Sequence, residues 1–309
     1  MKIAIMGSGG VGGFYGGRLA RGGEDVTFIA RGAHLEAMRK NGLQIESPTA
    51  GDFKLAEVQA TDNPAEAGVV DLVLVSVKTY GLEEAARAIV PMIGPETTVL
   101  PLLNGVDITG RLGAIGGEKH VIGGTVYVAA NIAAPGTIRH LTMDRLIFGE
   151  LEGGTSPRCE AIQEAFTAAG IEADHSSDIK MEIWRKFVGL IAISGVASVT
   201  RLPGKAVADD ADTRDLLGMA MGEVVRLARS QGIGLDENLP EQLVPMFDSW
   251  PPEAKPSMLV ALEAGSRLEL ESLQGTVVRM AEAAGVPTPV NRFIYTALKA
   301  FVNGPPSAS

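Results

Sequence analysis

The sequence is poor in residues that bind metals or form disulfides. It contains a single cysteine, Cys159, in 309 residues, which excludes an intrachain disulfide and a cysteine metal cluster. Its four histidines (His34, His120, His140 and His175) are scattered and show no HxxxH or HExxH spacing. A zinc site normally uses closely spaced ligands of these types, so we expect no metal.

Long apolar runs and an excess of positive charge are also missing. The longest apolar stretch, Phe187 to Val199, is too short to span a bilayer and carries glycine and serine. No cationic segment precedes an apolar one at the start, as a signal peptide requires. The net charge of −10 and the pI near 5.0 argue against nucleic-acid and membrane-surface partners. We expect a soluble, cytoplasmic protein, and its length favours two domains.

The stretch from Met1 to Arg31 predicts a dinucleotide-binding βαβ unit. An apolar strand, Lys2–Met6, runs into the glycine-rich turn Gly7–Gly13, and a helical pattern follows over Phe14–Arg21. A second apolar strand, Val26–Ala30, comes next. This order and length match the nucleotide-binding half of a doubly wound α/β sheet.

The glycines of the turn have separate tasks in this interpretation. Gly7 permits the tight turn, Gly9 lets a pyrophosphate approach the backbone, and Gly12 lets the helix pack close to the sheet. Free N–H groups at the helix start would hold the phosphates. The alternative is a turn that only packs a strand on a helix. The residues expected to line the cofactor are Gly7, Ser8, Gly9, Gly10, Val11 and Gly12.

Arg31 indicates which dinucleotide binds. NAD-selective sites usually place Asp or Glu at the end of the second strand, where it accepts hydrogen bonds from the ribose 2′-hydroxyl. This sequence has Arg31 after Ala30, and a guanidinium suits a 2′-phosphate. We therefore expect NADPH, with a solvated arginine at a strand end as the alternative.

The remainder of the first half alternates strands with helices. Strands buried on both faces are expected at Asp71–Val77 and Thr97–Leu103. Lys78 and Asn104 follow them at the carboxyl ends, where open α/β sheets bind ligands. The alternative for either is a turn residue, since Asn-Gly is among the commonest turn dipeptides. The other expected elements are helices at His34–Lys40, Leu82–Val90 and Ser156–Ala169, a loop at Pro91–Pro95, and β-structure at Gly42–Ser47, Phe53–Ala60, His120–Ala130, Thr137–Leu141 and Leu146–Leu151.

Beyond Gly170 the pattern is helical. We place the domain boundary by composition, giving a nucleotide-binding domain over residues 1–176 and a helical domain over residues 177–309. Asp178 is the expected N-cap of the first of these helices, and residues 303–309 have the composition of a disordered tail. The expected helices are Asp178–Ile193, Asp212–Ser230, Met258–Glu263, Glu269–Ala284 and Asn291–Val302.

Three residues of the helical half carry chemistry that periodicity alone does not assign. Lys186 lies early on its helix, and an ammonium buried among apolar neighbours is a usable proton donor; most helical lysines are solvated instead. Ser257 precedes an apolar helix and is usually read as a cap. Glu269 is usually read as a solvent-facing helical glutamate.

Taken in order, the motifs resemble the ketopantoate reductase (2-dehydropantoate 2-reductase) family over nearly the whole chain. The matching pieces are Gly7–Gly12 with Arg31, Val77-Lys78, Leu103-Asn104-Gly105-Val106, Pro135-Gly136 before His140, Trp184-Arg185-Lys186-Phe187, Pro256-Ser257-Met258, and Glu269 ahead of Gly275. The resemblance implies a Rossmann domain that binds NADPH, joined to a helical domain like that of 6-phosphogluconate dehydrogenase, with the active site in the cleft.

The resemblance also implies the residue roles. Lys186 would be the general acid, Ser257 would meet the substrate carboxylate, and Glu269 would lie near the nicotinamide ribose. Lys78 and Asn104 would serve cofactor and substrate, and Ala130 is placed with the cofactor residues. The implied reaction is hydride transfer to the ketone of a small 2-keto acid, with 2-dehydropantoate giving pantoate in pantothenate biosynthesis. A positioned ammonium stabilises the charge that grows on the ketone oxygen and then protonates it.

Three positions depart from the family pattern. Where members commonly carry asparagine, this sequence has Leu190, Ser194 and Gly204. Ser194 still offers a short hydrogen-bonding group, and we count it with the substrate contacts. Weaker recognition of a substrate hydroxyl keeps other functions open: a paralogue for a more apolar 2-keto acid, a hydroxyacid dehydrogenase, or a non-catalytic NADP(H) sensor. A homodimer also stays open.

Overall fold

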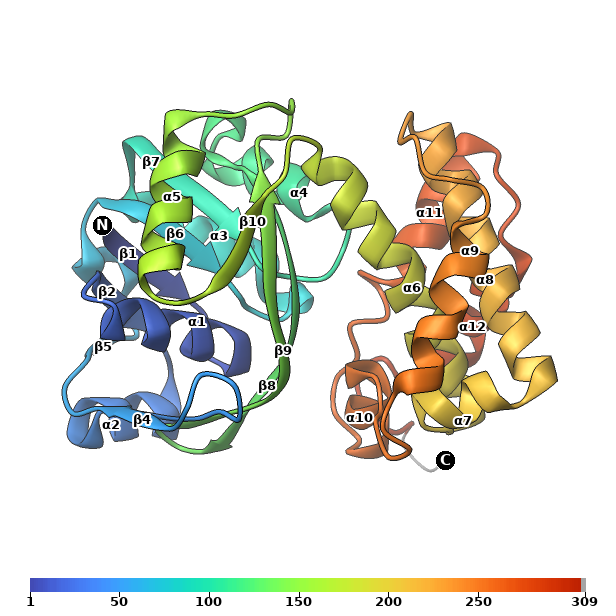
Figure 1. The fold of residues 1–309 in the computed structure, drawn as a ribbon, viewed down its shortest axis with the longest axis horizontal. Helices are drawn as coiled ribbons and strands as arrows, with labels where there is room; N and C mark the ends of the chain where they lie inside the picture. The colour runs from blue at the N-terminus through green and yellow to red at the C-terminus, as the bar shows by residue number, and fades with distance from the viewer. Residues whose placement is uncertain (307–309) are drawn as a thin grey trace. The chain divides into compact units, whose positions relative to one another are not determined.

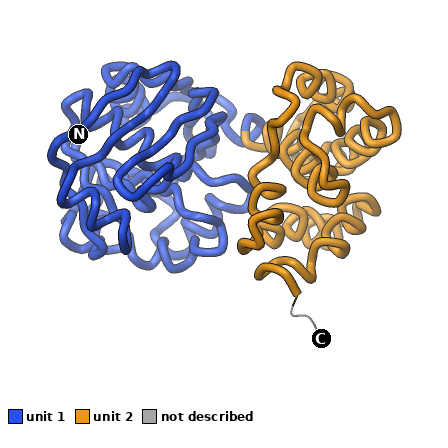
Figure 2. The backbone as a smooth tube through the Cα atoms, turned by 90° about the horizontal axis from the view of Figure 1, so that it is seen from below, with its two compact units in different colours: residues 1–182 blue, residues 183–309 orange. Residues whose placement is uncertain are grey.

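The computed structural model describes residues 1–306 and divides the chain into two compact units (Figure 2). Unit 1 comprises Met1–Glu182 and unit 2 comprises Ile183–Ser309. The division falls within helix α6 (Ile179–Thr200), whereas composition places it after residue 176. Part of the expected disordered tail, residues 307–309, lies outside the described residues.

Unit 1 is built around a parallel five-stranded sheet with the order β5-β2-β1-β6-β7 (Figure 1). The first strands pair in the registers Lys2↔Asp25 and Ile3↔Leu72. The α/β fold expected for the first half is therefore confirmed. The strands are β1 (Lys2–Met6), β2 (Asp25–Ile29), β5 (Gln59–Thr61), β6 (Val70–Val75) and β7 (Ile93–Pro101).

Both faces of this sheet are covered because its strands are apolar on both sides. Successive side chains of a strand point to opposite faces. In β1, Ile3 and Ile5 join one buried cluster with α1 (Gly10–Arg21) and α5 (Pro157–Ala168). Ala4 and Met6 join the other cluster, with α3 (Leu82–Ile89) and α4 (Ile108–Gly116).

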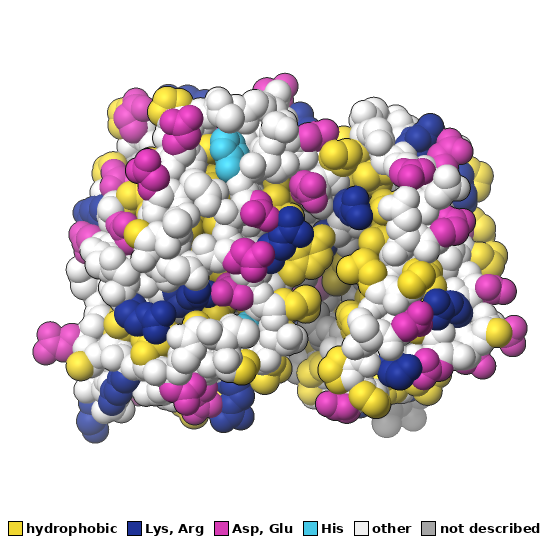
Figure 3. Space-filling model, in the orientation of Figure 1, with side chains coloured by type: hydrophobic (Ala, Val, Ile, Leu, Met, Phe, Trp, Pro, Cys, Tyr) yellow, Lys and Arg dark blue, Asp and Glu magenta, His cyan; other side chains and the backbone are white. Residues whose placement is uncertain are grey.

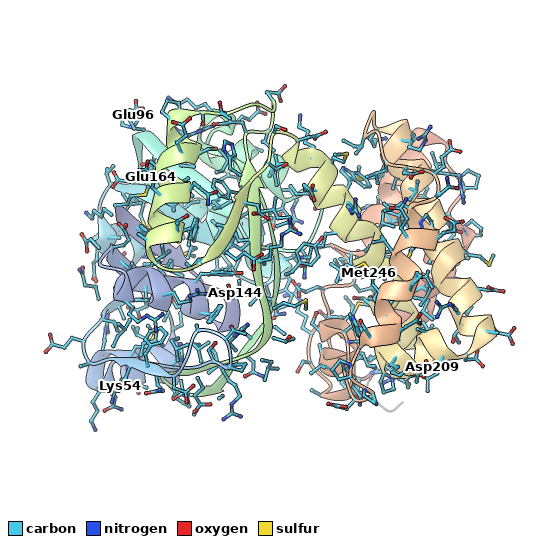
Figure 4. The ribbon with its side chains drawn as sticks, in the orientation of Figure 1. Lys54, Glu96, Asp144, Glu164, Asp209 and Met246 are labelled. Carbon is cyan, nitrogen blue, oxygen red and sulfur yellow. The ribbon has the colours of Figure 1, made fainter. Side chains whose placement is uncertain are left out.

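A second sheet covers the α1 side of unit 1. Its order is β10-β9-β3-β4, and β8 pairs with β9 as a long antiparallel hairpin turning at Pro135-Gly136. Arg18 of α1 forms a buried ion pair with Asp144 of β9, labelled in Figure 4. Burial raises the pKa of Asp144 above its ordinary value, and the hydrogen bond from Arg18 opposes that rise. The strands are β3 (Leu43–Glu46), β4 (Phe53–Leu55), β8 (Gly123–Ala134), β9 (Thr137–Gly149) and β10 (Glu172–His175).

Several element boundaries in unit 1 correct the sequence prediction. The first helix begins at Gly10, not Phe14, and β7 begins inside the expected loop Pro91–Pro95. The two strands expected at 137–141 and 146–151 are one strand, β9, whose bulge residue Met143 has φ +57°. Helix α4 and strand β10 were not predicted. The remaining elements of unit 1 are α2 (Gly32–Asn41) and short 3₁₀ turns at Pro64–Ala67, Thr79–Gly81, Val90–Met92 and Glu118–His120.

Unit 2 is helical, as expected, and is organised around α8 (Ala211–Ser230). This helix packs against α7, α9, α11 and α12. Its buried Glu223 accepts hydrogen bonds from the backbone N–H groups of Val290 and Asn291, which caps α12 from a neighbouring helix. The other helices are α7 (Gly204–Asp209), α9 (Leu239–Leu243), α10 (Ser257–Glu263), α11 (Gln274–Ala284) and α12 (Pro289–Leu298), with 3₁₀ turns at Val244–Ser249 and Lys299–Phe301.

The helix expected at Glu269–Ala284 is shorter than predicted. It begins at Gln274, and Glu269 lies in the preceding turn, where its carbonyl accepts from the N–H groups of Ser272 and Leu273. Asp178 caps α6 as expected, since its carboxylate accepts from the N–H of Met181 at 3.1 Å.

The length and burial of helix α6 and the distribution of surface charge are the features relevant to membrane and nucleic-acid partners. Within the described residues, α6 is the one helix long and apolar enough to cross a membrane, and most of its apolar window is buried inside the protein, as in a core helix. On the face shown in Figure 3, acidic and basic side chains are interspersed.

Candidate active site

The residues expected to bind a dinucleotide lie at one edge of the parallel sheet in unit 1. The glycine turn follows β1, Arg31 comes shortly after β2, Lys78 comes shortly after β6, and Asn104 comes shortly after β7. These four strands are consecutive in the order β2-β1-β6-β7. Because parallel strands all end at the same edge, the four segments share the edge at which open α/β sheets bind ligands.

The glycine turn forms a cradle that side chains would fill. Gly7 has φ +99°, a conformation that suits glycine. A Cβ on residue 10 would lie 2.2 Å from the carbonyl oxygen of Ala130, and one on residue 12 would lie 2.3 Å from that of Gly7. A Cβ on Gly9 would meet no described atom within 4 Å. The turn is therefore closed toward the protein and open at Gly9.

Helix α1 presents N–H groups at this opening. Its first intrahelical bond runs from Gly13 N–H to the Gly9 carbonyl at 2.7 Å, so the N–H groups of Gly10, Val11 and Gly12 precede the i→i−4 ladder. The first turn carries no acidic side chain. The positive end of the helix dipole and these donors suit a phosphate.

Ser8 is turned toward the protein. It is buried, its N–H donates to the Ile29 carbonyl at 3.1 Å, and its hydroxyl donates to the same oxygen at 3.0 Å. Ser8 therefore joins the ends of β1 and β2. The sequence motif alone does not distinguish this holding role from a phosphate contact.

Arg31 stands exposed at the N-cap of α2, and its guanidinium is paired. Its Nη2 donates to Oε1 of Glu84 at 2.6 Å. Glu84 lies in the first turn of α3, and both side chains are about two-thirds exposed (67% and 63%). An ion pair this exposed is weak, about 0–1 kcal/mol, and leaves Arg31 able to exchange partners.

Arg111 of α4 connects the segments that carry Lys78 and Asn104. Its guanidinium donates to Glu83 at 2.7–2.8 Å and to the carbonyl of Thr79, the residue after Lys78, at 3.3 Å. It also pairs with Asp107, the N-cap of α4, at 3.5 Å. Partial burial acts to raise the pKa of Glu83. The hydrogen bond from Arg111 and the nearby positive charge together outweigh burial, so the pKa of Glu83 lies below its ordinary value.

Lys186 is the chemically distinctive group of unit 2. It lies on α6, and its sequence neighbours Trp184 and Phe187 have buried rings that meet edge to face with 6.0 Å between centroids. The Lys186 side chain is half-buried, and removal from water lowers its pKa from 10.5 to about 8. A lysine with this pKa still holds its proton at neutral pH and gives it up more readily than an exposed one.

The residues one and two turns after Lys186 differ in exposure. Leu190 is half-buried, and Ser194 is fully buried with a hydroxyl that has no hydrogen-bond partner among the described residues. Unpaired buried hydroxyls cost free energy, so Ser194 is a polar group whose partner the described protein atoms do not supply.

Gly204, the third departure from the family pattern, lies under an aromatic ring. A Cβ there would be 2.5 Å from Cε3 of Trp250. Trp250 also packs edge to face on Phe247, with 5.1 Å between centroids. The Gly204 N–H donates to the Ala254 carbonyl at 2.9 Å, three residues before the exposed Ser257, which begins α10.

Sequence reasoning missed three residues near the candidate site: Glu84, Arg111 and Trp250. Glu84 and Arg111 sit on helices where their spacing is that of ordinary solvated charges, so only the ion pairs reveal them. Trp250 lies in an irregular segment with no motif. The sequence signals the Trp250 contact only through its partner Gly204, which is a small residue where the family commonly carries asparagine.

Comparison with known proteins places the chain in a family. The model "Ketopantoate reductase PanE/ApbA" matches residues 3–153, and its C-terminal counterpart matches residues 178–302. The chain is 33% identical over 310 residues to the 2-dehydropantoate 2-reductase of Mesorhizobium japonicum, covering 94% of each chain. It is 31% identical over 304 residues to the uncharacterized oxidoreductase YkpB of Bacillus subtilis, covering 97% of this chain and 99% of that one.

Solved structures of similar proteins support the same assignment. The 2-dehydropantoate 2-reductase of Geobacter metallireducens superposes with a TM-score of 0.90 at 31% identity, covering 96% of this chain and 98% of that one. D-mandelate dehydrogenase, solved with NADH, shares the fold with a TM-score of 0.87 at 22% identity, covering 97% of this chain and 98% of that one. This chain is accordingly an oxidoreductase acting on CH–OH groups and a member of the ketopantoate reductase family.

Proposed function

We propose that this protein reduces 2-dehydropantoate to pantoate, with NADPH as the hydride donor and Lys186 as the proton donor. The observation that carries the proposal is Lys186 itself. Its pKa is lowered to about 8 by burial, at the helix position that the family motif assigns to the general acid. The product would serve pantothenate biosynthesis.

The residues present suit the cofactor. The opening at Gly9 and the N–H groups of α1 fit a pyrophosphate, and the Arg31 guanidinium fits a 2′-phosphate. When bound, NADPH supplies the hydride that the ketone carbon accepts. We assign the cofactor to Gly7, Ser8, Gly9, Gly10, Val11, Gly12, Arg31, Lys78, Asn104, Ala130 and Glu269, with Ser8 acting by holding β1 to β2.

The chain's own part in the reaction is to orient the keto acid and to move one proton. The Ser257 hydroxyl donates to the substrate carboxylate, and the Asn104 amide and Ser194 hydroxyl offer further hydrogen bonds. The Lys186 ammonium stabilises negative charge on the ketone oxygen and transfers its proton there. Lys186 is afterwards reprotonated from solvent.

A steady-state assay tests this proposal. NADPH oxidation is followed with 2-dehydropantoate and with 3,3-dimethyl-2-oxobutanoate, the same keto acid without its hydroxyl. Lys186→Ala is the control, with NADPH binding measured separately. Turnover of 2-dehydropantoate that falls at least about a thousandfold in the variant supports the proposal, and turnover unchanged by the substitution contradicts it.

A paralogue for a more apolar 2-keto acid is the second candidate. Trp250 covers Gly204, and Leu190 stands one turn after Lys186. The Leu190 side chain offers no hydrogen bond, and the atoms of Trp250 that cover Gly204 are ring carbons, so recognition of a substrate hydroxyl and discrimination for it are reduced. A higher kcat/KM for 3,3-dimethyl-2-oxobutanoate than for 2-dehydropantoate would favour the paralogue.

The remaining alternatives separate by simple measurements. A hydroxyacid dehydrogenase would favour oxidation, and a sensor would bind NADPH tightly without turning over any keto acid. The cytoplasmic location and the homodimer remain predictions, the latter checked by light scattering of the purified protein.

A further inference from the structure

The Arg31–Glu84 ion pair lies where cofactor choice is made. The guanidinium that suits a 2′-phosphate already has a carboxylate partner at 2.6 Å. The two side chains come from different segments, the N-cap of α2 and the first turn of α3, fifty-three residues apart in sequence. The contact is therefore tertiary, and it joins the segment after β2 to the segment after β6.

A 2′-phosphate and Glu84 make competing demands on Arg31. Glu84 occupies one donor of the Arg31 guanidinium, the Nη2 group, which a 2′-phosphate would also use, and the carboxylate charge repels a phosphate that approaches the same guanidinium. A cofactor without the 2′-phosphate makes neither demand. Competition of this kind would weaken the binding of one cofactor and leave the other nearly unaffected, which is how a specificity element acts.

We propose that Glu84 is a cofactor-specificity residue that competes with the 2′-phosphate for Arg31 and so reduces the preference of this protein for NADPH over NADH. The proposal rests on the proposed function insofar as Arg31 receives the 2′-phosphate. It adds that the preference is set by the pair and not by Arg31 alone.

Binding measurements on three variants test it. The dissociation constants of NADPH and NADH are measured by calorimetry for the wild type, Glu84→Gln, Arg31→Ala and the double variant. Glu36→Gln is the matched control, because Glu36 is an exposed glutamate of α2 and its change removes the same charge without touching the pair.

Glu84→Gln is expected to tighten NADPH about three- to fivefold, the range of an exposed ion pair. NADH should change less than about twofold, and Glu36→Gln should leave both constants within about twofold. In the Arg31→Ala background the gain from Glu84→Gln should shrink, because no guanidinium remains to be released. Isolated 2′,5′-ADP should reproduce the NADPH result.

Two outcomes overturn the inference while the proposed function stands. Unchanged or weaker NADPH binding in Glu84→Gln would mean that the carboxylate does not compete or that it orients Arg31. Equal gains for NADPH and NADH would reduce the effect to general charge. If the wild type binds no NADPH, or if Arg31→Ala leaves the NADPH constant unchanged, the cofactor assignment fails instead.

Discussion

Gly9 and Gly12 stand three residues apart in one turn and have opposite surroundings. A Cβ on Gly9 would meet no described atom within 4 Å, whereas one on Gly12 would lie 2.2 Å from Oγ of Ser76 and 2.9 Å from Cγ2 of Ile5. Gly9 also has φ −77°, which any residue adopts. The fold itself therefore needs glycine at 12, and only a ligand would need it at 9.

This contrast predicts different losses for two matched substitutions. Gly9→Ala should change the free energy of unfolding by less than about 1 kcal/mol and raise the NADPH dissociation constant at least about tenfold. Gly12→Ala should destabilise by about 1–3 kcal/mol through overpacking. Thermal melting and calorimetry separate the two, and full NADPH affinity in Gly9→Ala would place the pyrophosphate elsewhere.

The lowered pKa of Lys186 predicts a pH dependence of the reduction. The proton donor must be charged, and with a pKa of about 8 it stays charged below that value and loses its proton above it. The kcat/KM for the keto acid should be flat near pH 6–7 and fall about tenfold per pH unit above pH 8. A profile that is flat to pH 10 would remove Lys186 from the proton transfer.

A stability measurement supplies the control for this assignment. Lys186→Met keeps the apolar stem of the side chain and removes its ammonium, so it should abolish reduction while the protein stays folded, with a change in the free energy of unfolding below about 1 kcal/mol. A large loss of stability would instead point to a structural lysine.

The ion pairs of Arg111 predict a positioning role. Arg111→Ala removes the side-chain hydrogen bonds to the Thr79 carbonyl and to Glu83, so the segments with Lys78 and Asn104 should lose their fixed spacing. We expect KM for cofactor and keto acid to rise about tenfold, with kcat less affected. Arg87→Ala, which removes an exposed arginine of α3, should leave KM unchanged. Equal effects of the two changes would indicate loss of charge alone.

How much of this the sequence predicts depends on the range of the interactions. The order of strand, glycine turn and helix over residues 1–31 is local, and so the nucleotide-binding sheet edge follows from it. The sequence pattern divides β9 into two strands because the bulge at Met143 interrupts it, and it extends α11 because the apolar spacing continues through the turn at Glu269. The partners Glu84, Arg111 and Trp250 depend on tertiary contacts, which periodicity does not encode.

The contact of Gly204 with Trp250 predicts that Gly204→Asn alone will destabilise the protein. In Gly204→Asn the new Cβ would lie 2.5 Å from the indole ring, so the ring must move, and we expect a loss of about 1–3 kcal/mol. In a Trp250→Ala background the cost of Gly204→Asn should shrink, because the ring that the new Cβ meets is gone.

If the apolar surroundings set the substrate, the double variant should also raise the kcat/KM ratio of 2-dehydropantoate over 3,3-dimethyl-2-oxobutanoate, because an amide then stands where the indole excluded it. Trp250→Ala alone is the control for lost packing and should leave the ratio unchanged. A folded double variant with no change in the ratio would show that residue 204 does not contact the substrate hydroxyl, and the choice of substrate would then rest on Leu190 and Ser194.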